Sequence, residues 1–229
     1  MGALGLGVSV PSLLWRPSAL QAKTSLQTVS KTLPLMETLV SMTACDPSRM
    51  RAEEALEKAF RRVQDLIPVF DRFDADSRLG RLNQTGSLRD VPPQLFEVLE
   101  TSKYLYHRST KTFDVTILPL LEEHRDSVIR TGRPPEIRRV QAILASVGFD
   151  KIQLDPRTIR FRHSGVRITL DGIAKGYLVD QAAQTLRRAG VHSALIDAGG
   201  DIRAVGSKGP GPWRIGLEDP LGRKKRLMA

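Results

Sequence analysis

The most informative stretch of the chain is residues 168–180, which read ITLDGIAKGYLVD. Residues 168–170 indicate a strand, Asp171 and Gly172 indicate a tight turn, and the residues that follow have helical spacing. Backbone N–H groups at a helix start lack partners within the helix and lie at the positive end of its dipole, so they suit a phosphate. Lys175 adds a positive charge for the same anion. This stretch therefore predicts an anion-binding turn where a helix begins.

The segments after this turn predict a helix and then several strands. We expect the helix to run from about 172 to 189 and to end at Gly190, which suits the left-handed stop position. Gly199 and Gly200 fit either a hairpin turn or a close approach of two strands near a site. The expected strands are residues 193–197, 201–205 and 213–217.

Upstream, strands and helices alternate without repeats. Residues 33–45 predict a strand, and Asp46-Pro47-Ser48 predicts the start of a helix whose apolar residues recur over 52–67. Residues 71–80 read as a polar turn region. Further helices are expected after Pro92-Pro93 and around 137–147, and short strands at 149–154, 158–162 and 166–170. This mixed order favours an α+β fold over a regular parallel sheet.

Composition narrows the classes of partner. The 229 residues carry a net charge of +10, which fits a solvated basic surface or attraction to dinucleotides, nucleic acid or acidic lipid. Only 5% of residues are aromatic, and no basic segment is interleaved with aromatic residues, so nucleic acid is the less expected partner. The single cysteine, Cys45, lies in an apolar run and is expected to be buried and inert. The four histidines show no zinc-ligand spacing.

The first 22 residues differ from the rest. They are small and apolar up to Leu14, a run too short for a membrane-spanning helix. They resemble the middle and end of a secretory signal with a cut after Ala22, although the positive n-region is missing. A leader whose start lies upstream would explain this and would place the protein in the periplasm or outside the cell, either free or associated with a membrane. The alternative is a disordered tail.

Several motifs together resemble the FAD:protein FMN transferase (ApbE-like) family. These are the turn at 168–180, the GGDIR segment at 199–203 and WRIGLEDP at 213–220, preceded by three upstream matches: LMETLVSM at 35–42, FDADSRLGRLN at 73–83, and FDVT at 113–116 with Pro119-Leu120. The resemblance implies an ApbE-like α+β fold with mixed, largely antiparallel sheets and packed helices over 33–220. Residues 1–22 would be a truncated signal-like segment, and 221–229 a basic tail.

The resemblance also implies a reaction. Enzymes of this family move the FMN half of FAD onto a threonine or serine hydroxyl of a target flavoprotein, with release of AMP. Positioning and charge neutralisation should dominate such an attack on a diphosphate, and Mg²⁺ would offset the developing charge. The expected partners are therefore FAD and an acceptor flavoprotein, and no transmembrane segment is expected.

The family's site residues map onto this chain by motif. Asp171 and Lys175 would be catalytic and would contact FAD, and the Gly172 carbonyl would approach the metal. The other expected FAD contacts are Met36, Phe73, Phe113, Asp114, Val115 and Thr169. Plainer readings stay open: Lys175 as an exposed lysine, Asp171 as a helix cap, Gly172 as a turn glycine, Asp114 as a cap, and Met36 and Phe73 as core residues.

The chain also departs from the family pattern. Thr169 stands where the family usually has an acid, the acid here being Asp171, and Glu37 follows Met36 where glycine is usual. The family normally continues beyond IGLxDP with a segment whose acid and threonine hold the metal, and that segment is absent. We therefore expect a C-terminally truncated chain with an incomplete metal site. The alternatives are an inactive member that at most binds FAD and, less expected, a basic nucleic-acid-binding protein.

Overall fold

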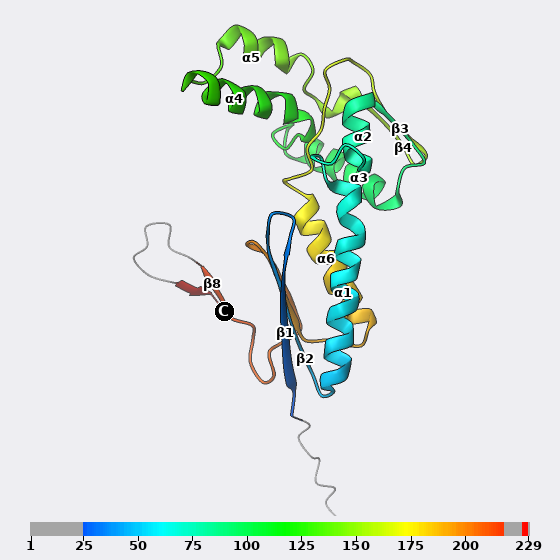
Figure 1. Cartoon of the computed structure of the whole chain (residues 1–229), viewed down its shortest axis with the longest axis vertical. Coiled ribbons are helices and arrows are strands. Elements are labelled where there is room, and N and C mark those ends of the chain that lie inside the picture. Colours follow the sequence, from blue (N-terminus) through cyan, green and yellow to red (C-terminus); the bar gives the residue numbers. More distant parts are fainter. Residues whose placement is uncertain (1–24, 218–225, 229) are drawn as a thin grey trace, which may run out of the picture.

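The computed structural model describes residues 25–217 and 226–228, arranged as an α+β fold (Figure 1). Every strand pairing in this part of the chain is antiparallel, which confirms the expected fold class. The main sheet has the order β1-β2-β6-β7, a small sheet has the order β3-β5-β4, and β8 pairs with β9. The strands are β1 Gln27–Leu35, β2 Thr38–Asp46, β3 Ser87–Arg89, β4 Ile152–Asp155, β5 Thr158–Phe161, β6 Ala194–Ala198, β7 Asp201–Val205, β8 Ile215–Leu217 and β9 Arg226–Met228.

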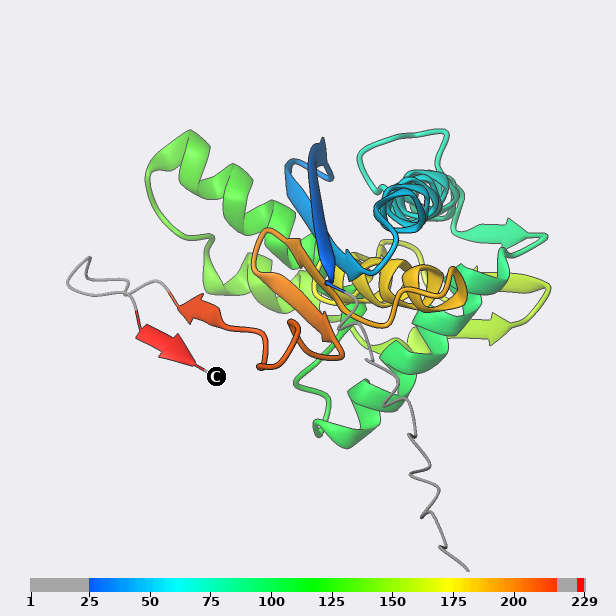
Figure 2. The same cartoon turned by 90° about the horizontal axis from the view of Figure 1, so that it is seen from below.

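Two helices cover one face of the main sheet. Helix α1 packs against β1 and β2, and α6 packs against β6 and β7 and lies beside α1 (Figure 2). The apolar faces of both helices meet the inward side chains of the sheet in one core. The helices are α1 Arg49–Phe70, α2 Arg78–Thr85, α3 Pro93–Arg108, α4 Leu118–Thr131, α5 Ile137–Leu144 and α6 Ala174–Arg188, with short 3₁₀ turns η1 Val115–Ile117 and η2 Phe149–Lys151.

The single strand expected at 33–45 is wrong, because the chain turns back on itself within it. Met36 and Glu37 form a two-residue turn between β1 and β2, and both have positive φ, 55° and 57°. Turns of this kind are normally marked by Asn-Gly or similar pairs, and neither residue gives that signal. Alternation continues through both strands, so the pattern alone hid the hairpin. By contrast, Gly199 and Gly200 form the predicted hairpin turn between β6 and β7.

A second lobe packs α2, α3 and the small sheet around its own core, to which the end of α1 and the start of α6 also contribute. The expected polar turn at 71–80 is shorter than predicted, because α2 begins at Arg78 with Ser77 as its cap. Helix α4 was not predicted. Together with α5 it forms a hairpin that projects from this lobe (Figure 1). Cys45 is buried, as predicted.

The strand expected at 166–170 is extended but pairs with no strand among the described residues. Its backbone is satisfied in another way: the Asn83 side chain donates to the Ile168 carbonyl at 2.9 Å and accepts from the Ile168 N–H at 2.8 Å, while the Thr169 N–H donates to the Val115 carbonyl at 2.8 Å. Helix α6 then begins at Ala174, two residues later than predicted.

No helix in the described part of the chain is long and apolar enough to cross a membrane. The signal-like segment expected at 1–22 lies outside the described residues. Of the expected basic tail, only β9 is described.

Candidate functional site

A cavity of about 330 Å³ lies where the two lobes meet. Three segments form its walls: the β1–β2 turn, the end of α1 with the loop behind it, and the start of α6. Four of the predicted site residues line it, namely Met36, Phe73, Asp171 and Lys175. Its other lining residues are Glu37, Ile67, Phe70, Asp71, Arg72, Ala174 and Leu178.

The β1–β2 turn supplies one wall. Met36 is partly buried and packs against both cores, so its alternative reading as a packing residue agrees with the structure. Its side chain still borders the cavity, together with that of Glu37. A ligand in this cavity would therefore meet one flexible apolar side chain and one carboxylate from the turn.

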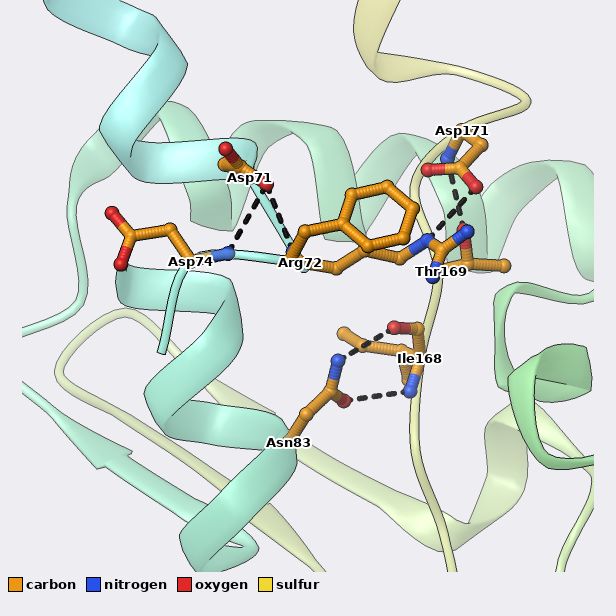
Figure 3. Close-up of polar contacts among 8 residues, drawn as sticks. Asp71, Arg72, Asp74, Asn83, Ile168, Thr169 and Asp171 are labelled. Atoms are coloured by element: carbon orange, nitrogen blue, oxygen red, sulfur yellow. Dashed lines mark hydrogen bonds and ion pairs between the residues drawn. The ribbon is translucent and has the colours of Figure 1, made fainter. Parts of the chain in front are cut away.

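The loop after α1 is held in place by its own side chains (Figure 3). The Asp71 carboxylate accepts from the Phe73 N–H at 2.8 Å and from the Asp74 N–H at 3.3 Å. The Ser77 hydroxyl donates to the Asp71 carbonyl and accepts from the Gly80 N–H, which joins the loop to the first turn of α2. These side-chain-to-backbone bonds fix the position from which Phe73 reaches the cavity.

Arg72 is the site residue that sequence reasoning missed. Its Nε donates to Asp171 Oδ2 at 2.9 Å, which joins two segments far apart in the chain (Figure 3). Its guanidinium lies 3.9 Å from the centre of the Phe73 ring, within the range of a cation–π contact. The side chain is only 16% exposed. Nothing in the local pattern around residue 72 indicates a partner at residue 171.

The start of α6 carries Asp171, Lys175 and Tyr177. Asp171 is not the helix cap, because the cap position is Ile173, and the Asp171 N–H donates to the Thr169 hydroxyl at 3.2 Å. Lys175 forms an ion pair with Asp201 at 3.0 Å. The Tyr177 hydroxyl donates to Glu97 at 2.8 Å, and its burial and this carboxylate raise the pKa of Tyr177, so the phenol stays protonated. The helix start is thus fixed to the second lobe.

The remaining predicted residues lie beside the cavity rather than in its lining. Asp114 caps η1, accepting from the N–H and the hydroxyl of Thr116 at 2.9 and 2.6 Å, so its plainer reading as a cap is correct. Val115 is bonded to Thr169 through the backbone, as described above. Phe113 lies next to Gly172, where an added Cβ would meet its ring at 3.7 Å. The structure therefore brings these residues to the same turn, and their contact with a nucleotide stays a prediction.

The described residues do not form a metal site by themselves. They contain no group of three or more histidine, cysteine, aspartate or glutamate side chains placed to hold a metal ion. The acid nearest to Gly172 in the chain, Asp171, is paired with Arg72. The role of Gly172 as a metal ligand therefore stays a prediction.

The cavity combines apolar and charged groups. Phe70, Phe73 and Met36 offer apolar surface, Arg72 and Lys175 bring positive charge, and three lining residues bring negative charge, namely Glu37, Asp71 and Asp171. Such a lining can contact both a planar apolar ring and a charged group of one ligand. Both cations already have carboxylate partners, Asp171 for Arg72 and Asp201 for Lys175, so an anionic ligand at Lys175 would compete with Asp201.

Comparison with known proteins identifies the family to which the chain is similar. Residues 36–229 match the ApbE family. A FAD:protein FMN transferase of Rhodobacter capsulatus is 31% identical over 144 residues, which cover 59% of this chain and 26% of that protein. The one from Haemophilus influenzae is 28% identical over 175 residues, covering 72% and 51%. The chain thus spans about half, or less, of the length of these curated relatives.

Solved structures share the fold. The flavin transferase ApbE from Vibrio cholerae superposes with a TM-score of 0.78 at 23% identity, over 89% of this chain and 68% of the other. The apo form of Pseudomonas stutzeri flavinyl transferase ApbE gives 0.77 at 23% identity, over 89% and 66%. At these identities, the likeness establishes the shared architecture.

Proposed function

The chain belongs to the ApbE family, and we propose that it is a FAD:protein FMN transferase. In the proposed reaction, a threonine or serine hydroxyl of a target flavoprotein attacks the phosphorus of the FMN half of FAD. The bond from this phosphorus to the bridging oxygen breaks, AMP leaves with that oxygen, and the hydroxyl proton is released. The observation that supports this most directly is the cavity in which four family-motif residues from three segments meet.

We propose separate roles for the apolar and the charged residues of the cavity. Met36 and Phe73 would contact the flavin, because they supply its apolar surface. Lys175 and the first turn of α6 would hold the diphosphate, since a lysine and a helix start both attract anions. The Asp171 carboxylate would be a catalytic group beside Lys175 and the helix start. The segment Phe113-Asp114-Val115, with Thr169, would support the nucleotide from behind the turn.

Magnesium is a separate part of the proposal. A bound Mg²⁺ would offset charge on the diphosphate, and this ion commonly takes one or two protein ligands, with phosphates and water completing its shell. Transfer measured with and without a chelator tests this part. Equal rates in both conditions would remove magnesium from the proposal.

The test of the proposed function is covalent transfer. The protein is mixed with FAD, Mg²⁺ and an acceptor peptide containing threonine and serine, and the products are resolved on a denaturing gel. We expect flavin fluorescence on the peptide and AMP in solution. Lys175→Ala should abolish transfer, whereas Lys103→Ala should not, because Lys103 is an exposed lysine on α3 that does not line the cavity.

The outcomes separate the candidate functions. Fluorescent peptide supports the transferase. FAD that is retained but removed by denaturation supports a protein that binds FAD without transferring it. Unchanged FAD affinity in Lys175→Ala would show that the anion site lies elsewhere.

We also propose that residues 33–220 are the transferase domain and that the protein is exported. The basis for export is the signal-like character of residues 1–22. Cell fractionation tests it: recovery with periplasmic or membrane markers is expected, and recovery with cytoplasmic markers alone would contradict it.

A further inference from the structure

Phe73 exposes a large aromatic ring at the cavity. The residue is 64% exposed, although it belongs to a loop whose backbone is fixed by Asp71. An aromatic ring on an ordered loop beside a cavity offers a flat apolar surface to a ligand.

One face of this ring is already covered. The Arg72 guanidinium lies over it at 3.9 Å, and a guanidinium is planar, so it can stack on the ring as well as attract it. Arg72 is itself largely buried, so the stacked pair has little freedom to separate.

Asp171 binds the guanidinium at its edge, through Nε. The 2.9 Å bond from Arg72 Nε to Asp171 Oδ2 is charge-assisted, and such bonds hold their geometry more strongly than neutral ones. Figure 3 shows Arg72 reaching across from the loop to Asp171. Asp171 is in turn held by its own N–H bond to the Thr169 hydroxyl.

We propose that Asp171, Arg72 and Phe73 form a stacked platform in which Arg72, anchored by Asp171, holds the Phe73 ring at the place that the proposed function assigns to the flavin of FAD. Phe73 contacts the flavin ring, and Arg72 and Asp171 are positioning residues that hold Phe73 in place. This inference rests on the proposed function, because it takes the planar ligand to be a flavin. It also gives the displaced acid Asp171 a role that does not require a metal.

Arg72 could act in this platform through planar stacking or through its charge alone, and the two roles can be separated. If Arg72 served mainly as a charge for the diphosphate, lysine would replace it adequately. If Arg72 serves as a planar support, lysine keeps the charge and loses the stack. Arg72→Lys therefore separates the two roles.

The experiment uses lumiflavin, the flavin ring without ribityl or phosphate groups. Binding to the full chain is followed by quenching of flavin fluorescence and by the shift of the visible flavin band. For Phe73→Leu, Arg72→Lys and Asp171→Asn we expect at least tenfold weaker binding and loss of the spectral shift. The conservative variants Phe73→Tyr and Asp171→Glu should keep most of the lumiflavin affinity and most of the spectral shift.

A matched ion pair serves as the control. Arg139 and Glu123 join α4 and α5 at 3.0 Å, and Glu123 is 17% exposed, close to the value for Arg72. Arg139→Lys and Glu123→Gln should leave lumiflavin binding and the spectral shift unchanged. Thermal unfolding and near-ultraviolet circular dichroism show whether each variant is folded. If Phe73→Leu does not fold, Phe73→Tyr and Asp171→Glu still test the platform.

Two results would overturn the platform. One is wild-type protein that neither quenches nor shifts lumiflavin. The other is Arg72→Lys with wild-type lumiflavin binding, which assigns Arg72 to the diphosphate instead. Failure of peptide flavinylation alongside normal lumiflavin stacking would count against the proposed transfer reaction and support the platform.

Discussion

Gly80 shows how a single atom can decide the shape of the site loop. A Cβ added at Gly80 would lie 2.0 Å from the Asp74 carbonyl oxygen, a backbone atom that cannot move without shifting the loop that carries Phe73. We predict that Gly80→Ala lowers the free energy of unfolding by roughly 1–3 kcal/mol, the usual cost of overpacking. Urea unfolding measures this change.

The control for this prediction is the other helical glycine of the site region. Gly176 has open space around its missing Cβ and lies within α6, so Gly176→Ala should be neutral or stabilise by up to about 1 kcal/mol. Equal destabilisation of both variants would mean that contact with Asp74 is not what requires glycine at position 80.

The pKa of Asp46 predicts how the stability of the fold changes in acid. Its burial opposes the charged form, but hydrogen bonds from the Arg51 guanidinium and the Ser48 N–H outweigh this and lower the pKa of the carboxyl. Because the folded pKa lies below the unfolded value, the charged group stabilises the fold fully above about pH 4, and this contribution disappears as pH falls through the folded pKa.

Asp46→Asn should therefore cost about 2 kcal/mol at pH 7, the typical value for hydrogen bonds to a charged group. The difference from wild type should shrink as pH falls below about 4. Urea unfolding between pH 3 and 7 measures both effects, and a difference that stays constant over this range would refute the assignment.

The site residues that could be predicted were those named by a sequence motif, and a residue defined only by a tertiary contact could not be predicted. Met36, Phe73, Asp171 and Lys175 were identified because the family motifs name them, and the fold brings them to one cavity. Arg72 could not be found in this way. Its role arises from an ion pair with a residue 99 positions away, and no local periodicity records such a meeting.

At the element scale, the extended segment 166–170 is held by Asn83 where a strand would normally lie. Asn83→Leu would leave both the N–H and the carbonyl of Ile168 without partners, since Asn83 satisfies both. We predict a loss of roughly 2–4 kcal/mol, because an unsatisfied buried polar group costs 1–3 kcal/mol. Faster amide exchange at Ile168 should accompany it.

The neighbouring Gln84 provides the comparison. It is exposed on the same helix, so Gln84→Leu should change stability by no more than about 0.5 kcal/mol. If Asn83→Leu behaves like Gln84→Leu, the segment must be held by other contacts. The prediction of a strand at 166–170 was wrong for the same physical reason. The Asn83 side chain makes the backbone hydrogen bonds that a neighbouring strand would otherwise make, and a pattern of apolar residues cannot reveal this substitution.

The β1–β2 turn carries backbone strain that a substitution can release. Glu37 has φ of 57°, where an L-residue with a side chain costs about 1–2 kcal/mol and glycine does not. After allowing for the greater freedom of glycine in the unfolded chain, Glu37→Gly should stabilise the protein by about 0.5–1 kcal/mol.

Glu37→Ala separates this effect from the charge of the side chain. Alanine keeps the strained φ, so it should give little or none of the gain. Thermal unfolding of the three proteins measures the comparison, and stabilisation by alanine equal to that by glycine would point to the carboxylate and away from the backbone.

At the scale of the whole molecule, the cavity lies where two separately packed lobes meet. Met36 belongs to both cores, and α6 runs from the second lobe into the first. The α+β class followed from the mixed order of elements, but this junction depends on how the lobes pack. Sequence patterns report the buried face of a helix and not the element that covers it.

A ligand in this cavity should therefore stabilise both lobes together. With free FAD at 100 times its dissociation constant, linkage predicts about 2.7 kcal/mol, or on the order of 5–10 °C in Tm for a chain of this size. Hydrogen exchange should slow at the β1–β2 turn, at residues 71–74 and at the start of α6, because these segments line the cavity. Helices α4 and α5 contribute no lining residue and serve as the internal control. Protection confined to α4 and α5, or an unchanged Tm in saturating FAD, would place the ligand outside the junction of the two lobes.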